Sequence, residues 1–86
     1  MVGRVHWLLW NLSPQFKGKY ILSYDYTFHR YFFYRRKGYK VYDCFTVIRT
    51  SKRCFRVMYC NLQENRFEYF SCRTSAETAK KMESII

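Results

Sequence analysis

The fold is decided by the aromatic segment KYILSYDYTFHRYFFY at residues 19–34 and by YKVYDCFTVIR at residues 39–49, which follows a basic turn. In the first segment, large apolar residues occupy most even-numbered positions, and Ser, Asp, Thr and His lie mostly between them. Alternation with a period of two predicts a β-strand that buries one face. The segment is longer than a typical strand, so we expect a bulge or a strong bend within it.

The basic turn at residues 35–38, with the sequence Arg-Arg-Lys-Gly, predicts that these two segments form a hairpin. Gly38 can take the positive φ that such a turn requires. A symmetric closure places stabilising side-chain pairs opposite each other. The predicted pairs are Tyr34 with Tyr39, Phe28 with Phe45, and Arg30 with Asp43.

Alternating segments and turn-forming residues continue on both sides of this hairpin. We expect five strands, near residues 4–11, 19–34, 39–49, 54–61 and 66–72. Symmetric closure of the last hairpin puts Cys54 opposite Cys72, at a separation that a disulfide tolerates. We nevertheless expect free thiols, because no secretory signal is recognisable and the default compartment is then reducing.

The pattern changes to that of a helix near the end of the chain. Thr74 and Glu77 match a capping box, in which a hydroxyl and a carboxylate satisfy free backbone amides. Apolar residues then recur at helical spacing. The sequence therefore predicts a single α+β domain over residues 1–86, a five-stranded antiparallel β-meander with one C-terminal helix near residues 75–86.

The composition favours a partner that is a polyanion. Sixteen Lys and Arg against six Asp and Glu give a formal net charge of +10, and 22% of the residues are aromatic. Such a charge exceeds what solubility requires and attracts nucleic acid. So many rings cannot all be buried in a small core, and exposed rings usually mark a contact surface.

Several other classes of protein are disfavoured. No apolar run is long enough to span a membrane, and the short one near the N-terminus ends too soon for a signal peptide, so we expect an unprocessed cytoplasmic protein. The four cysteines form no CxxC pair, and we expect neither a metal nor a cofactor. The two histidines and scattered carboxylates match no catalytic motif, so we expect no enzyme.

The candidate nucleic-acid-binding residues are cations that contact phosphates and rings that stack on bases. The predicted cations are Arg35, Arg36, Lys37, Lys40, Arg49, Lys52, Arg53 and Arg56. The predicted stacking rings are Tyr24, Tyr26 and Phe28. A competing interpretation is that these rings simply form the core of the sheet, and that Arg30 only pairs with Asp43.

The order of elements, a basic and aromatic meander followed by one capped helix, resembles small single-strand-binding folds such as a transcriptional coactivator family and the Pur repeat. The last three strands and the helix also resemble three-stranded DNA-binding modules of the integrase arm type. The first resemblance implies single-stranded substrates and a homodimer, and the second implies duplex DNA. Both are resemblances of topology, so no functional residue is carried over.

We therefore predict a small non-enzymatic protein that binds nucleic acid, with single-stranded DNA or RNA favoured. The alternative is a phage or mobile-element protein that binds and inhibits a host nucleoprotein complex, as anti-CRISPR inhibitors and adaptors do. Tyr and Arg are also the preferred hot-spot residues of protein interfaces, so composition does not separate the two hypotheses.

Overall fold

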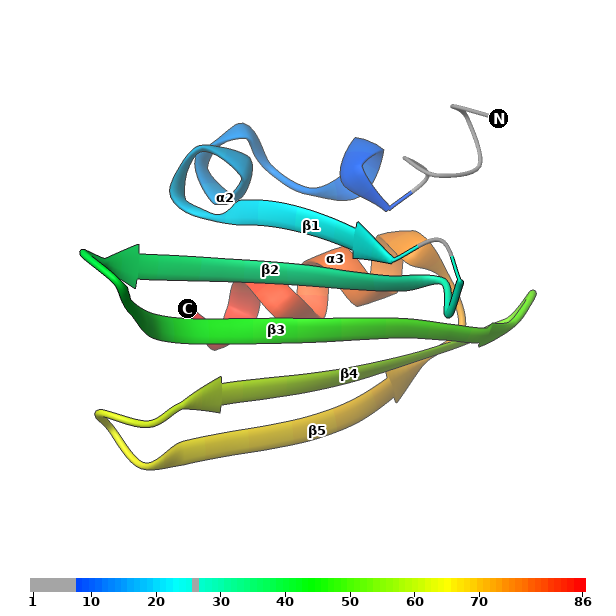
Figure 1. The fold of residues 1–86 in the computed structure, drawn as a ribbon. Helices are drawn as coiled ribbons and strands as arrows, with labels where there is room; N and C mark the ends of the chain where they lie inside the picture. The colour runs from blue at the N-terminus through cyan, green and yellow to red at the C-terminus, as the bar shows by residue number, and fades with distance from the viewer. Residues whose placement is uncertain (1–7, 26) are drawn as a thin grey trace.

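The computed structural model describes residues 8–25 and 27–86. Its elements are the 3-10 helix η1 (Leu9–Asn11), the helix α2 (Pro14–Lys19), the strands β1 (Ile21–Asp25), β2 (Arg30–Lys37), β3 (Lys40–Ser51), β4 (Cys54–Asn61) and β5 (Arg66–Cys72), and the helix α3 (Ser75–Ile85). The strands form one antiparallel sheet in the order β1-β2-β3-β4-β5 (Figure 1). The predicted five-stranded meander with a C-terminal helix is confirmed.

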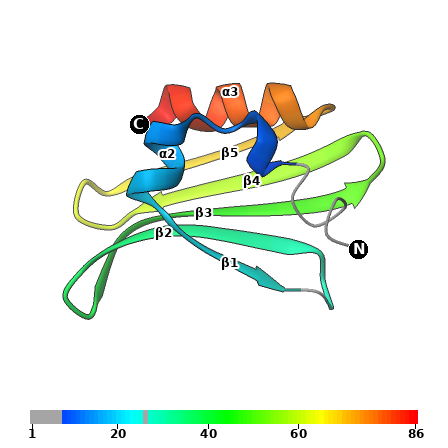
Figure 2. The ribbon, with the colours of Figure 1, turned by 90° about the horizontal axis from the view of Figure 1, so that it is seen from above.

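All helices pack on one side of the sheet, and the other side carries no covering element within the described residues (Figure 2). The core lies between the helices and the sheet. It is formed by buried residues from the N-terminal segment, the three strands β2, β3 and β4, and α3: Leu8, Leu12, Phe16, Tyr20, Tyr31, Phe33, Phe45, Val47, Val57, Tyr59, Ala79, Met82 and Ile85. The sheet therefore has a covered face and an open face.

The prediction of a strand near residues 4–11 is wrong for residues 8–11, which are the part that the structure describes. Residues 8–11 form a turn and η1, whereas residues 4–7 lie outside the described residues. The apolar residues from Leu8 to Tyr20 that reach the core recur every fourth position, which is helical spacing. Ser13 caps α2 by accepting a hydrogen bond from the amide of Phe16 at 3.2 Å. This segment covers the sheet instead of extending it.

The expected strand at residues 19–34 is two strands, β1 and β2, which pair with each other. The chain reverses because the Asp25 carboxylate accepts hydrogen bonds from the amides of Thr27 and Phe28, at 2.9 and 3.4 Å. His29 completes the reversal with a φ of 50°. The expected bend is thus a full turn, and it supplies the fifth strand that the N-terminus does not.

The predicted register of the central hairpin is also wrong, including the pairs Tyr34–Tyr39, Phe28–Phe45 and Arg30–Asp43. The turn consists of Gly38 and Tyr39 alone, and Lys37 faces Lys40. Gly38 has a φ of 62°, as the first position of a tight two-residue hairpin turn can require. A bulge then shifts the pairing so that Arg35 faces Asp43.

The last hairpin is displaced by one residue from its predicted register. Cys72 faces Phe55, and Cys54 faces Ser51 across the β3–β4 pair. Cys54 and Cys72 therefore do not stand opposite each other, and all four cysteines of the chain are free thiols in the structure. Asn65, with a φ of 51°, provides the left-handed position of this turn.

Candidate functional site

The open face of the sheet consists of three rows of side chains that cross all five strands. The first row is Ile21, Tyr34, Cys44, Cys60 and Phe67. The second row is Ser23, Phe32, Thr46, Met58 and Tyr69. The third row is Asp25, Arg30, Ile48, Arg56 and Ser71. We call these fifteen residues the open face.

The open face exposes large apolar side chains. Phe67 and Tyr69 are 60% and 59% exposed, and Met58 is 48% exposed. Phe28 lies in the β1–β2 turn at one end of this face and is 61% exposed. Contiguous exposed apolar surface of this kind marks an interaction site more often than scattered single residues do.

Carboxylates are nearly excluded from the open face. All six acidic residues lie in the described part of the chain, and Asp25 is the one on this face. Arg30 lies beside Asp25 in the third row, and its Nη2 atom is 3.2 Å from the Oδ2 atom of Asp25. Burial by itself would raise the pKa of Asp25, but Arg30 and two turn amides hold it below its ordinary value of 3.8. The open face therefore presents no unpaired negative charge.

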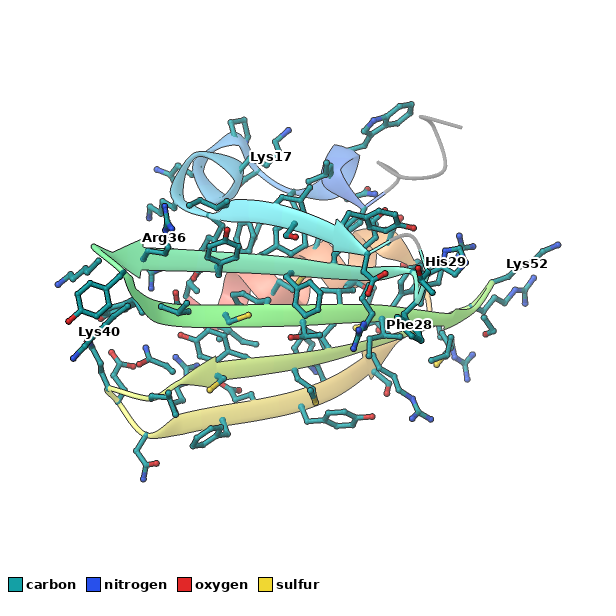
Figure 3. All side chains as sticks on the ribbon, in the orientation of Figure 1. Lys17, Phe28, His29, Arg36, Lys40 and Lys52 are labelled. Carbon is teal, nitrogen blue, oxygen red and sulfur yellow. The ribbon has the colours of Figure 1, made fainter. Side chains whose placement is uncertain are left out.

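Cations gather at both ends of β3. Arg36, Lys37 and Lys40 are exposed at the tip of the β2–β3 hairpin, while Lys52 and Arg53 are exposed in the β3–β4 turn. Figure 3 shows Arg36 and Lys40 at one end of the molecule and Lys52 at the other. The longest dimension of the molecule is 34 Å. The structure thus places five of the predicted cations in two groups, with the open face between them.

Arg56 is the remaining predicted cation of the open face. It is exposed in the third row, between Ile48 and Ser71. Its position lies nearer the Lys52 end than the Lys40 end of the sheet, since β4 begins directly after the β3–β4 turn.

Two predicted cations have structural roles. The Arg35 guanidinium binds the Asp43 carboxylate on the covered face through two hydrogen bonds of 2.7 and 2.8 Å. That hydrogen-bonded contact raises the pKa of Arg35. Arg49 donates to the backbone carbonyls of Ser51 and Lys52, at 3.3 and 3.4 Å, and so holds the β3–β4 turn. Neither guanidinium is placed on the open face.

The three predicted rings have different positions. Tyr24 points to the covered face, where its ring contacts Tyr31 with centroids 4.6 Å apart. Tyr26 lies outside the described residues. Phe28 is exposed, and the Arg30 guanidinium lies 4.9 Å from its ring centroid. Phe28 is therefore the one predicted ring that the structure shows accessible beside the open face.

The most exposed rings of the open face, Phe67 and Tyr69, were not among the predicted site residues. The alternation in residues 66–72 could have indicated these rings. It places Phe67 and Tyr69 on one face of the strand and Phe70 on the opposite face. Deciding which face is covered requires knowing where the helices dock. The rings predicted for the site come from β1 and the β1–β2 turn, where the observed register differs from the expected one.

No group of three or more His, Cys, Asp or Glu among the described residues could hold a metal ion. No helix within the described residues is long and apolar enough to cross a membrane. No family model, curated protein or solved structure matches this chain. The open face and its basic ends are therefore the candidate functional site.

Proposed function

We propose that this protein binds single-stranded nucleic acid across the open face and catalyses no reaction. The observation that carries this proposal is the combination of exposed rings, basic ends and the absence of unpaired carboxylates on this face. Rings serve as flat partners for bases, and exposed cations serve as partners for phosphates. The four free thiols favour a cytoplasmic setting, where cysteines stay reduced.

The spacing of the exposed rings suits unstacked bases. Phe67 and Tyr69 are two positions apart on β5, so their Cα atoms are separated by about 6.8 Å. This is roughly twice the 3.4 Å between neighbouring bases in a stacked strand. One ring can therefore hold one base and its neighbour the next, provided that the strand is extended. Each base stacked on an aromatic side chain contributes about 1–3 kcal/mol to binding.

The basic ends define the length of strand that the face can hold. A dimension of 34 Å corresponds to about ten nucleotides of a stacked strand, and to fewer nucleotides of an extended one. Six exposed cations contribute along this length: Arg36, Lys37, Lys40, Lys52, Arg53 and Arg56. If all six contact phosphates, the logarithm of the binding constant falls with the logarithm of salt at a slope of about −4.

A duplex is a poorer ligand for this surface. Paired and stacked bases keep their flat faces inside the helix, so Phe67 and Tyr69 would meet only the sugar-phosphate backbone. A duplex would then gain the electrostatic attraction without the contribution of the rings. We accordingly expect single strands to bind more tightly than duplexes of the same length.

A protein partner is the second candidate ligand, and it has a specific observation in its favour. Ile21, Ile48 and Met58 share the open face with the rings, and aliphatic side chains of this kind are typical of protein interfaces. The partner would be a subunit of a nucleoprotein complex or a second copy of this chain. In that case mutation of the open face disrupts a protein complex and leaves oligonucleotide affinity unchanged.

The test is fluorescence anisotropy with a labelled 12-nucleotide single strand and the matching duplex, at two salt concentrations. The double substitution Phe67→Ala and Tyr69→Ala should weaken single-strand binding at least 30-fold, since two stacking contacts are lost. Trp10→Ala is the matched control, because Trp10 is 79% exposed in η1, on the helix side of the sheet. We expect Trp10→Ala to change affinity less than twofold.

Charge substitutions test the basic ends separately. Lys40→Glu should weaken binding and reduce the salt slope by about one, whereas Lys80→Glu on the exposed side of α3 should do neither. Equal effects of the two substitutions would show that net charge alone attracts the oligonucleotide. Association that vanishes near physiological salt would reject the nucleic-acid proposal and favour the protein partner.

A further inference from the structure

Cys44 of β3 and Cys60 of β4 stand directly opposite each other in the antiparallel pair. Both belong to the first row of the open face, between Tyr34 and Phe67. Each side chain is half-buried, and each thiol is free in the structure. The two sulfur atoms are therefore neighbours on a surface that no helix of the described chain covers.

The backbone geometry of this pair fits a disulfide. Residues directly opposite in antiparallel strands have Cα atoms about 4.5–5.5 Å apart, and disulfides span Cα separations of about 4.4–6.8 Å. Their Cβ atoms point to the same side of the sheet, as a bridge between the two strands requires. The other two cysteines have different partners, because Cys54 faces Ser51 and Cys72 faces Phe55.

We propose that Cys44 and Cys60 form a modification site for small-molecule disulfides of the glutathione type, which oxidise the pair to a reversible intramolecular disulfide. The inference goes beyond nucleic-acid binding, since bridge formation does not depend on what the open face binds. A half-buried bridge on the open face is more accessible to reductants than a fully buried structural disulfide. The site can therefore return to two thiols when the reductant is in excess.

The reaction proceeds by two thiol–disulfide exchanges. The thiolate of one cysteine attacks a sulfur of the small disulfide, breaks its S–S bond, and releases one small thiolate. The second cysteine, deprotonated, attacks the protein sulfur of the mixed disulfide, forms the Cys44–Cys60 bond and displaces the other small thiolate. Two electrons pass from the protein to the small disulfide, and the two thiol protons end on the released small thiols.

Proximity of the two thiols is what makes this pair distinctive. Burial raises the pKa of Cys44, and the neighbouring Cys60 adds to this effect. Attack by Cys44 on the small disulfide is therefore slow near neutral pH. The second exchange is intramolecular, and correct placement of two groups gives such steps a large advantage over attack from solution.

The chain offers a direct assay because trypsin separates the four cysteines. Cleavage after Lys and Arg places Cys44 in peptide 41–49, Cys54 in 54–56, Cys60 in 57–66 and Cys72 in 67–73. The full-length protein is incubated with oxidised glutathione, remaining thiols are alkylated at low pH, and the peptides are analysed by mass spectrometry. We expect peptide 41–49 linked to peptide 57–66, while the other two cysteines are alkylated.

Serine substitutions provide the matched controls. Cys44→Ser should stop the reaction at a glutathione adduct on Cys60, whereas the double substitution Cys54→Ser and Cys72→Ser should leave the bridge unaffected. A reductant should restore two alkylatable thiols. The proposal is overturned if oxidation occurs at Cys54 or Cys72 first, or if all four thiols react equally. Because the wild-type peptide map needs no substitution and no oligonucleotide, its result is independent of the binding proposal.

Discussion

Arg35 and Asp43 face each other across β2 and β3, and the guanidinium holds the carboxylate with two parallel contacts, Nε to Oδ1 at 2.7 Å and Nη2 to Oδ2 at 2.8 Å. Asp43 is only 1% exposed. The hydroxyls of Tyr20 and Tyr59 also donate to its Oδ2 atom, at 2.8 and 2.9 Å. This network joins Tyr20 of the N-terminal segment to the strands β2, β3 and β4 through one buried charge.

Removing the cation from this network should strongly destabilise the protein. Arg35→Met leaves the Asp43 carboxylate buried without its charged partner, a change that costs about 3 kcal/mol of unfolding free energy in comparable sites. Arg36→Met is the control, because Arg36 is the exposed neighbour, and we expect a change within about 0.5 kcal/mol. Urea denaturation measures both. Similar losses for the two variants would contradict the structural role of Arg35.

The free energy of unfolding at acidic pH should depend on the ionisation of Asp43. Burial alone would raise the pKa of this carboxyl, but hydrogen bonds from Arg35, Tyr20 and Tyr59 hold it below its ordinary value of 3.8. Since the folded pKa is the lower one, the stabilisation is complete above pH 3.8 and is lost as the pH falls through the folded pKa. The gap in unfolding free energy between wild type and Asp43→Asn should therefore shrink below about pH 4.

Urea titrations at several values between pH 2 and pH 7 give this gap directly. Asp25, whose pKa is also lowered, is present in both proteins, so its contribution cancels in the difference. A gap that stays constant down to pH 2 would mean that folding does not lower the pKa of Asp43.

The N-terminal segment at residues 8–20 should contribute to stability as part of the core. Phe16 is 1% exposed, and its ring stacks on Tyr20 with centroids 4.4 Å apart. Phe16→Ala should lower the unfolding free energy by about 4 kcal/mol, because it leaves a cavity under α2. Phe67→Ala on the open face is the matched control and should cost less than about 1 kcal/mol. Comparable losses would show that the open face is buried in solution.

Replacing either of two glycines by alanine should change the stability of the protein, in opposite directions at the two positions. Gly18 lies in α2, where an added Cβ meets nothing within 4 Å, so Gly18→Ala should stabilise the protein by about 0.5–1 kcal/mol. Gly38 also has open space, but its φ of 62° disfavours any side chain. We expect Gly38→Ala to destabilise by about 1 kcal/mol. Thermal denaturation of the two variants, compared with wild type, checks both signs.

The sequence predicted β3, β4, β5 and α3 nearly to the residue, since each shows a strong local pattern. It also indicated which residues of the β3–β4 turn are exposed cations. The N-terminal segment was misread, although Ser13 and Pro14 form a good helix start. The division of residues 19–34 was missed because Asp25 and His29 fit the alternation of a strand and only their hydrogen bonds and dihedrals reveal a turn.

The sequence by itself determined the types and order of the elements from β3 to α3 and the excess of positive charge, because periodicity, capping and charge are properties of neighbouring residues. Only the tertiary structure decided the register and the choice of face. The central hairpin closes at Gly38 and Tyr39 with a bulge, which moves the residue opposite Asp43 from the expected Arg30 to Arg35, five positions later. The docking of α2 and α3 on one side buried Tyr31 and Phe33 and left Phe67 and Tyr69 exposed. These outcomes depend on contacts between residues far apart in the chain, which no local pattern contains.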